Sequence, residues 1–303
     1  MPRKINVITT CFNKDLMKDP SMERNFQKTM GFLDSFSKMK PDIICFPEVF
    51  LRTGIDDNIK DSDEITKKAF DSLSERARSL NCYIIAGAHE YIDSRKYNVA
   101  WLFNRNGRLE GRYCKCFPTI QEINETQITP GSEMPVFETD FGKLGITICY
   151  DIGFSNIWST LASKGAELIA WISDYDGGFP LQTYAWSNSY YIVSSVRTNH
   201  SKIIDKTGRI LSSSSRWGGW TSRVIDLDKQ IFHTDYHDNK LAEIQHKLGN
   251  GVTIENFSEE GIFTLESNDA EWPMERIISE FSLETFKDYH LRAAKVHNMQ
   301  RRL

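Results

Sequence analysis

The sequence has neither an excess of positive charge nor a long apolar run. Its 37 lysine and arginine residues are outnumbered by 41 aspartate and glutamate residues, for a formal net charge of −4. Nucleic-acid-binding proteins usually carry a basic face, and a membrane-spanning helix needs roughly 20 apolar residues. We therefore expect no nucleic-acid partner and no membrane. Residues 1–7 lack the apolar segment of a signal peptide, which favours a cytoplasmic protein.

Zinc-binding and disulfide patterns are also missing. No two cysteines form a C-x-x-C pair, and no histidine is spaced to complete a zinc site with them. A cytosolic chain of this size favours free thiols over a disulfide framework, and most should be buried. We predict no metal site, and the open question is which thiol reacts. The six cysteines all lie in the first half of the chain: Cys11, Cys45, Cys82, Cys114, Cys116 and Cys149.

What the chain does contain is a twice-repeated order of strand and helix signals. Its 303 residues, 40% of them hydrophobic, suffice for one large domain or two small ones. The period of the apolar residues predicts these elements. In the first half they are strands at 5–10, 42–46 and 82–87, helices at 25–39 and 63–80, and a hairpin at 97–113 that turns at Asn106-Gly107. In the second half they are strands at 144–149, 167–172 and 191–196, helices at 155–164 and 181–189, and a hairpin that turns at 206–208, with Ser155 as a helix N-cap.

The predicted central strands are apolar on successive residues, which indicates burial on both faces. Two such sheets packed together with helices outside give a four-layer α-β-β-α sandwich, and one doubly wound sheet is the alternative. The hairpin that ends each half favours the sandwich.

The last quarter of the chain has a different character. We predict a domain over residues 1–228, followed by an extension over 229–303 that is polar and charged, with no strong strand and a helix at about 284–299. The extension is expected to pack on the core or on a neighbouring subunit. Just before the boundary, the loop with Trp217 and Trp220 either lines a pocket or anchors the fold, and anchoring is the commoner use of such loops.

Cys149 is the thiol in the most reactive position. It ends an apolar strand and is followed by a short turn and a helix. Such a turn exposes a nucleophile, leaves backbone N–H groups free to bind an oxyanion, and places a helix N-terminus nearby that favours the thiolate. Taken alone, a cysteine here is more often a buried core residue.

Two charged residues stand at similar positions elsewhere. Glu48 follows the strand at 42–46 and is flanked by Pro47 and Val49, a setting that suits a general base. Lys115 follows the predicted hairpin among cysteine and aromatic residues, and Glu122 lies seven residues further on. Each alone fits an ordinary surface residue, but a thiol, a base and a fixed cation together satisfy a nucleophilic site.

In their order along the chain, these motifs resemble the nitrilase superfamily of carbon-nitrogen hydrolases. The matching segments are residues 42–48 for the glutamate, 112–115 for the lysine and 145–151 for the cysteine, with 165–169 resembling the next strand. The resemblance covers roughly residues 4–228. It implies the four-layer sandwich, a Glu48-Lys115-Cys149 triad, no cofactor, and a homodimer or larger homo-oligomer.

The resemblance implies a role for each residue. Glu48 takes the Cys149 proton, Lys115 and the Tyr150 backbone N–H stabilise the oxyanion, and Glu122 holds Lys115. Substrate-binding candidates follow the next strand: Trp171, Ser173 and Asp174. Asp174 is expected either to receive a cationic substrate group or to cap the following segment.

The motifs disagree about the substrate. Residues 115–122 look like the nitrile-acting branch, whereas Cys149-Tyr150-Asp151 looks like the amidase and carbamoylase branches. Residues 154–156 depart from the Phe-Pro-Glu of many members, a difference that concerns the helix more than the chemistry. We expect a small amide or ureido (N-carbamoyl) substrate first and a nitrile second.

Two other functions remain open. One is a catalytically silent relative that serves as a binding or assembly protein through residues 229–303. The other is a glutaminase module, which requires a second catalytic domain for which this segment is too short.

Overall fold

A computed structural model describes residues 2–56, 61–237 and 239–302 of the chain. They fall into two compact units, one of Ile5–Ile225 and one that combines Met1–Lys4 with Asp226–Leu303. We describe each unit by itself. Among the described residues, no helix is both long and apolar enough to cross a membrane.

The first sheet has the strand order β12-β1-β2-β3-β4-β5. Strands β1, β2 and β3 run parallel, and β3, β4 and β5 continue as antiparallel neighbours. The predicted turn at Asn106-Gly107 joins β4 to β5. The strands are β1 (Lys4–Thr10), β2 (Ile43–Cys45), β3 (Tyr83–Ile92), β4 (Arg95–Phe103), β5 (Leu109–Cys114) and β12 (Trp220–Asp226).

The second sheet has the order β11-β10-β9-β8-β7-β6. Its central strands β7, β8 and β9 are again parallel. The strands are β6 (Val136–Glu138), β7 (Lys143–Ile148), β8 (Leu168–Ser173), β9 (Tyr191–Val196), β10 (Lys202–Ile204) and β11 (Ile210–Ser213).

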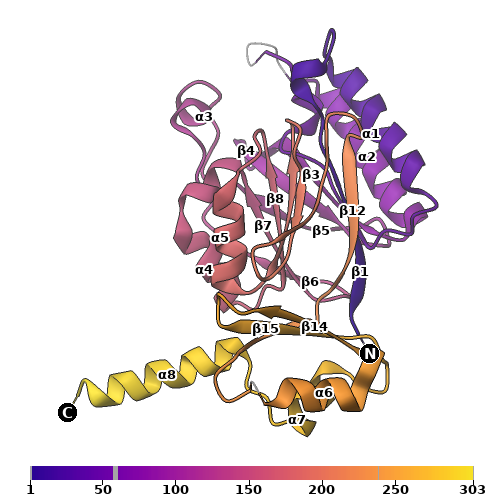
Figure 1. The fold of residues 1–303 in the computed structure, drawn as a ribbon. Coiled ribbons are helices and arrows are strands. Elements are labelled where there is room, and N and C mark those ends of the chain that lie inside the picture. Colours follow the sequence, from indigo (N-terminus) through magenta and orange to yellow (C-terminus); the bar gives the residue numbers. More distant parts are fainter. Residues whose placement is uncertain (1, 57–60, 238, 303) are drawn as a thin grey trace. The chain divides into compact units, whose positions relative to one another are not determined.

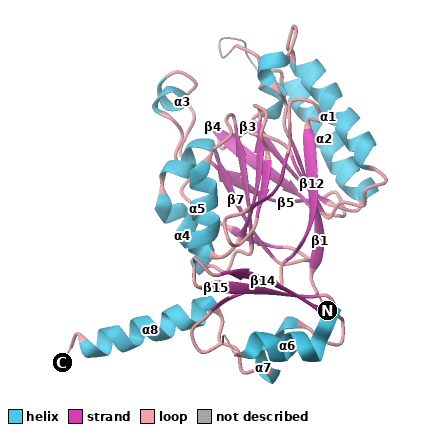
Figure 2. Ribbon diagram, viewed as in Figure 1, coloured by secondary structure: helices cyan, strands magenta, loops and turns pink. Residues whose placement is uncertain are grey.

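Helices cover the outer face of each sheet (Figures 1 and 2). Helices α1 (Met22–Phe36) and α2 (Asp63–Leu80) lie on the first sheet, and α4 (Ser155–Ser163) and α5 (Phe179–Asn188) lie on the second. All residues of β8 and β9 are buried, as expected for strands covered on both faces. The predicted four-layer α-β-β-α sandwich is confirmed.

Hydroxyl groups join the two sheets where they face each other. Thr9 Oγ1 in β1 donates to the Ser194 carbonyl in β9 at 2.6 Å. Ser195 Oγ in β9 donates to the Thr10 carbonyl at 2.8 Å and to the Cys45 carbonyl at 3.0 Å. Because buried polar groups need partners, these bonds account for the serine and threonine residues between the sheets.

The ends of several elements differ from the predictions. Helix α1 begins at Met22, because Ser21 accepts the Arg24 N–H and caps it three residues earlier than expected. The prediction that Ser155 is an N-cap is wrong, since Phe154 occupies that position and Ser155 is the first helical residue. Helix α2 has the predicted bounds.

The second unit contains a sheet that the sequence did not predict. Its strands β13 (Gln230–His233), β15 (Ile262–Ser267) and β14 (Val252–Phe257) pair in that order. The expectation of no strong strand was wrong. Polar residues flank or interrupt the apolar ones in each of these strands, although Phe263 and Leu265 are fully buried. Helices α6 (Lys240–Leu248) and α7 (Met274–Glu280) add to this core, and α8 (Phe286–Gln300) confirms the predicted last helix. How this segment packs on the core or on another subunit stays a prediction.

Candidate active site

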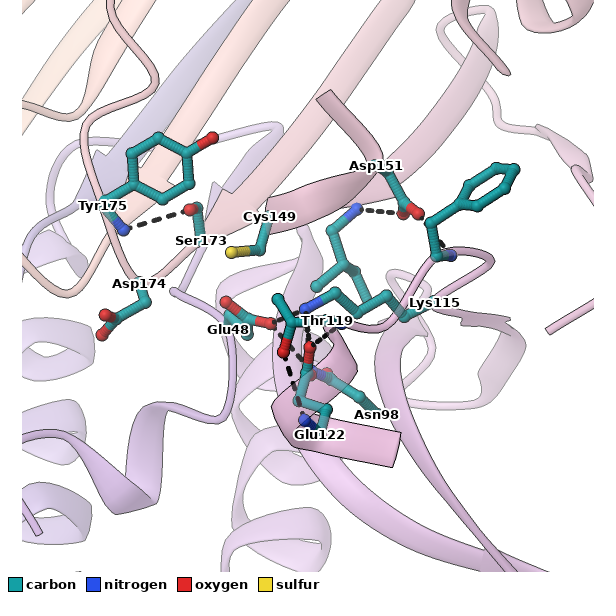
Figure 3. Close-up of polar contacts among 12 residues, drawn as sticks. Glu48, Asn98, Lys115, Thr119, Glu122, Cys149, Asp151, Ser173, Asp174 and Tyr175 are labelled. Atoms are coloured by element: carbon teal, nitrogen blue, oxygen red, sulfur yellow. Dashed lines mark hydrogen bonds and ion pairs between the residues drawn. The ribbon is translucent and has the colours of Figure 1, made fainter. Parts of the chain in front are cut away.

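Three strands of the first unit end beside one cavity of about 210 Å³. Glu48 follows β2, Lys115 directly follows β5, and Cys149 directly follows β7. All three side chains line the cavity and are nearly buried, with residue exposures of 5%, 1% and 8%. Figure 3 shows them facing the same space. The fold therefore brings the sequence-predicted triad together.

Lys115 lies between two carboxylates. Its Nζ is 2.8 Å from Glu48 Oε1 and 2.8 Å from Glu122 Oε2. Burial alone opposes the ammonium charge, but the negative charges around Lys115, that of Glu48 first, outweigh it and raise the pKa of Lys115. Burial likewise opposes the charge of Glu122, and Lys115 outweighs it and lowers the pKa of Glu122. Lys115 is thus a fixed cation and Glu122 a fixed anion.

Asn98 in β4 ties this cluster together, and the sequence analysis missed it. Its Nδ2 donates to Glu48 Oε1 at 2.7 Å and to Glu122 Oε1 at 2.9 Å. Its carbonyl accepts the Lys115 N–H at 2.9 Å. One buried residue therefore positions all three charged side chains. The only signal in the sequence is an asparagine at the start of an apolar strand.

A short helix fixes Glu122. In α3 (Ile120–Asn124), Thr119 is the N-cap and Glu122 the third helical residue of a capping box. Glu122 Oε2 accepts the Thr119 N–H at 2.7 Å, and Thr119 Oγ1 accepts the Glu122 N–H at 3.2 Å. Glu122 therefore serves the helix and Lys115 at the same time.

Glycine is required behind Glu48. Gly87 in β3 packs so closely that a Cβ there would lie 2.6 Å from Glu48 Cα and 2.6 Å from Val49 N. The Gly87 N–H donates to the Pro47 carbonyl at 3.1 Å. The next residue, Val49, has a φ of 40°, which is unusual for a β-branched side chain. The backbone at Glu48 is therefore held in a tight bend against β3.

Cys149 occupies a strained turn. Its φ is 47°, in the left-handed region, and it begins a short 3-10 helix at Cys149–Gly153. Burial first, and then the negative charge of Glu48, raise the pKa of the Cys149 thiol to about 12, although Lys115 and hydrogen bonds to Ser173 and the Asp174 backbone oppose the shift. At neutral pH the resting group is a thiol, so it needs a base to become a nucleophile.

Asp151 anchors the cysteine turn, and it too was missed. Its Oδ2 accepts the Ile148 N–H at 2.9 Å and the Tyr113 hydroxyl at 2.7 Å, and its Oδ1 accepts the Phe117 N–H at 2.9 Å. Burial raises the pKa of Asp151 to about 6 against the effect of these bonds. Because Phe117 follows Lys115 closely in the chain, Asp151 fixes the cysteine turn relative to the lysine loop.

The predicted pocket residues lie in different places. Trp171 and Ser173 are fully buried, and Trp171 Nε1 donates to the Cys149 carbonyl at 3.1 Å, which helps to hold the turn. Tyr150 is 45% exposed and packs edge-on against Phe154. Only Asp174 of these four lines the cavity.

Asp174 is bound by two cations. Its Oδ1 is 2.6 Å from Arg197 Nε and its Oδ2 is 2.7 Å from Lys14 Nζ. Burial opposes the charge of Asp174, but Arg197 and Lys14 outweigh it and lower the pKa of Asp174. Ser173 Oγ, rather than Asp174, accepts the Tyr175 N–H, at 3.1 Å. Among the residues that the structure describes, no group of three or more histidine, cysteine, aspartate or glutamate side chains could hold a metal ion.

Sequence comparison identifies relatives of the chain. A family model described as carbon-nitrogen hydrolase matches residues 13–230. A probable nitrilase of Schizosaccharomyces pombe is 28% identical over 257 residues, covering 75% of this chain and 93% of that protein. The omega-amidase of Bos taurus is 25% identical over 256 residues, covering 74% and 87%. A probable hydrolase of Bacillus subtilis is 32% identical over 164 residues, which span 51% of this chain and only 32% of that protein.

Solved structures share the fold. An amidase from Nesterenkonia sp. aligns with a TM-score of 0.65 at 17% identity, covering 80% of this chain and 95% of that one. A mutant of that amidase, with a TM-score of 0.62, 17% identity and the same coverage, shows covalent addition of the acetamide moiety of fluoroacetamide at its active site cysteine. Identity this low supports the fold alone. The family model carries the assignment: this chain belongs to the carbon-nitrogen hydrolase family.

Proposed function

We propose that this protein hydrolyses a small carboxamide or N-carbamoyl compound through a Glu48-Lys115-Cys149 triad. The observation that carries the proposal is the position of a buried, protonated Lys115 between Glu48 and Glu122, on the same cavity as the Cys149 thiol. The arrangement supplies a nucleophile, a base and a fixed positive charge, the parts that covalent acyl transfer requires.

The hydrogen bonds of Glu48 select the oxygen that acts as base. Oε1 already accepts from Asn98 at 2.7 Å and from Lys115 at 2.8 Å. In Figure 3 the other carboxylate oxygen lies on the side of the Cys149 sulfur. That oxygen takes the thiol proton as the sulfur attacks, which is needed because the pKa of Cys149 is raised to about 12.

Attack of the sulfur on the carbonyl carbon gives a tetrahedral oxyanion. Lys115 Nζ and the Tyr150 backbone N–H stabilise it, and loss of one such donor typically costs about 3 kcal/mol. Glu48 returns its proton to the leaving nitrogen, the carbon-nitrogen bond breaks, and a Cys149 thioester remains. Glu48 then removes a proton from water, the hydroxyl replaces the sulfur, and the thiol is restored. This chemistry uses no cofactor.

A nitrilase is the second candidate. Residues 115–122 favour it, as does the likeness to a probable nitrilase of Schizosaccharomyces pombe. The Cys149-Tyr150-Asp151 motif and the likeness to an omega-amidase favour the amide. Ammonia release from matched amide and nitrile pairs distinguishes the two reactions.

Mass spectrometry of the intact protein tests the triad. Cys149→Ala should abolish hydrolysis. Glu48→Gln should slow both the attack of the thiol and the hydrolysis of the thioester, and any acyl adduct that accumulates in it should map to Cys149. Cys82→Ala, at another buried cysteine, is the matched control and should keep full activity. Full activity of Cys149→Ala, or an adduct on Cys114 or Cys116, would refute the assignment.

Two further expectations accompany this function. A catalytically silent relative would show no faster labelling of Cys149 by a small electrophile than of the other five thiols. We also expect a homodimer or larger homo-oligomer, which sedimentation analysis of the purified protein tests.

A further inference from the structure

His89 is a cavity residue that the triad does not use. It lies in β3 and lines the same cavity as Cys149. In the antiparallel pairing of β3 with β4, His89 is opposite Asn98, whose side chain donates to Glu48. Opposite residues of such a pair lie on the same face of the sheet, with Cβ atoms about 4.5–5.5 Å apart. His89 therefore stands beside the residue that ties the buried charges together.

Asp61 holds the ring of His89. The ring Nδ1 is 3.1 Å from Asp61 Oδ2, and Asp61 also contacts Arg52 Nη1 at 2.9 Å and Lys96 Nζ at 3.2 Å. Burial opposes the charge of Asp61, but the hydrogen bond from His89 and the two cations outweigh it and lower the pKa of Asp61. An ionised carboxylate only accepts hydrogen bonds, so the Nδ1 atom of His89 carries the proton that faces it.

The other ring nitrogen of His89 is left for a ligand. Within residues 2–56, 61–237 and 239–302, the ring makes no hydrogen bond except the one with Asp61. In a neutral imidazole with its proton on Nδ1, the Nε2 atom is an acceptor. Thr126, which lines the same cavity, donates its hydroxyl proton to the Glu122 carbonyl at 2.8 Å and likewise keeps only acceptor capacity. Both residues suit a ligand group that donates a hydrogen bond.

Charge and cavity size narrow the choice of donor. Arg52 and Lys96 against Asp61 give the surroundings of His89 a net charge of +1, which repels an ammonium group. A hydroxyl group donates a hydrogen bond without carrying charge. The cavity of about 210 Å³ is below the roughly 300–1,000 Å³ of typical ligand pockets, so the molecule that carries the hydroxyl must be short.

We propose that His89 is a specificity-determining residue that accepts a hydrogen bond from a hydroxyl group on the carbon chain of a short substrate, whose amide or ureido carbonyl lies at Cys149. This inference rests on the proposed function and narrows its substrate class to hydroxyl-bearing amides or N-carbamoyl compounds. Asp61 is a positioning residue, because it sets the tautomer of His89 without touching the substrate.

Amides with the same four-carbon chain test the proposal by steady-state kinetics: 2-, 3- and 4-hydroxybutanamide, their methyl ethers, and butanamide. A methyl ether keeps the oxygen but loses the donor. At least one hydroxyamide should have a higher kcat/KM than both its methyl ether and butanamide. His89→Leu should lower the kcat/KM for that hydroxyamide about three- to tenfold relative to its effect on butanamide, because one hydrogen bond is lost.

Three further variants separate recognition from packing. His89→Gln can present an amide oxygen as an acceptor and should keep part of the preference for the hydroxyl. Asp61→Asn can donate to Nδ1 of His89, which moves the ring proton to Nε2, so the preference for the hydroxyl over the methyl ether should be lost. The control His246→Leu, at an exposed histidine of α6, should match the wild type. If His89→Leu lowers activity on all seven amides equally, the residue serves packing only and the proposal is refuted.

A binding measurement separates this inference from the triad. By calorimetry, at least one hydroxybutanamide should bind to the Cys149→Ala protein more tightly than its methyl ether does. The additional His89→Leu change should weaken that binding about three- to tenfold. If no hydroxybutanamide binds more tightly than its ether, or if the binding does not depend on His89, the hydroxyl site is refuted. If the binding depends on His89 but no amide is hydrolysed by the wild type, the site holds and the proposed function fails.

Discussion

Two three-charge clusters border the same cavity with opposite composition. In the first, Lys115 lies between Glu48 and Glu122, and the side-chain exposures are 1%, 6% and 20%. In the second, Asp174 lies between Lys14 and Arg197, and the exposures are 35%, 29% and 20%. One cluster has a net charge of −1 and is buried, and the other has a net charge of +1 and is open to water.

Burial decides what each cluster can do. Two unit charges 4 Å apart interact by about 1 kcal/mol in water and about 4 kcal/mol at the effective dielectric constant near a protein surface. The buried cluster can therefore hold a proton on a chosen atom against a large penalty. The open cluster loses most of its pair energy to water and salt, but it can exchange water for a ligand. The proposed chemistry therefore draws on the first cluster.

The largest effect should follow removal of the central cation. Lys115→Met leaves two buried carboxylates without their partner and should lower the free energy of unfolding by about 3–5 kcal/mol at neutral pH. One carboxylate then binds a proton more readily in the folded state than in the unfolded chain, so the deficit should shrink as the pH falls. Chemical denaturation at several pH values measures this change. Lys143→Met, at an exposed pair with Glu138, is the control and should cost no more than about 1 kcal/mol. If Lys115→Met and Lys143→Met lowered the free energy of unfolding equally, burial would not set the strength of these ion pairs.

The next effect concerns Asn98. Asn98→Leu removes two hydrogen bonds to charged groups, each typically worth about 1.5–3 kcal/mol, and should reduce kcat about 10- to 100-fold or more. Because the hydrogen bond from Asn98 contributes to lowering the pKa of Glu122, its loss should raise that pKa and move the acid limb of the kcat/KM profile to higher pH. A profile that keeps its shape while stability falls would assign Asn98 a role in packing only.

A smaller effect concerns the state of the nucleophile. The negative charge of Glu48 contributes to raising the pKa of Cys149 to about 12, so Glu48→Gln should lower that pKa while hydrolysis is lost. Thiolate absorbance, measured as the difference from a Cys149→Ser protein, follows the titration. An unchanged or higher thiol pKa in Glu48→Gln would show that Glu48 does not face the sulfur as an anion.

The smallest effect should come from the open cluster. Lys14→Met removes one partner of Asp174 and should change the free energy of unfolding by no more than about 1 kcal/mol. High salt should reduce this change by screening the ion pair. A salt-independent change in the free energy of unfolding would mean that Lys14 acts through packing instead of charge.

The sandwich could be predicted because neighbouring residues in the sequence determine its strands and turns. Successive apolar residues in β8 and β9 indicate burial on both faces, and the Asn106-Gly107 pair is typical of a hairpin turn. The three strands of the second unit were missed because polar residues flank or interrupt their apolar residues within a charged segment. Their pairing depends on contacts made after folding, such as that between Phe232 and Phe263.

The site was predictable only in part, because some of its residues depend on contacts between distant parts of the chain. Glu48, Lys115 and Cys149 each follow a strand and belong to a motif, and their catalytic roles stay predictions. Asn98 and Asp151 depend on partners distant in sequence: Asn98 Nδ2 reaches Glu48, 50 residues away, and Asp151 Oδ2 reaches the Tyr113 hydroxyl, 38 residues away. The sequence alone did not give the orientation of Trp171, whose Nε1 donates to the Cys149 carbonyl.

The shared role of Glu122 links the triad to the surface of the protein. The same carboxylate that binds Lys115 closes the capping box of α3, whose residue Ile120 is 77% exposed. A proton or substrate that alters the charge balance at Lys115 should therefore change the stability of this helix. By thermodynamic linkage, formation of the helix changes the binding free energy of that proton or substrate by the same amount. The stability of the exposed helix α3 therefore changes with the charge state around the buried Lys115.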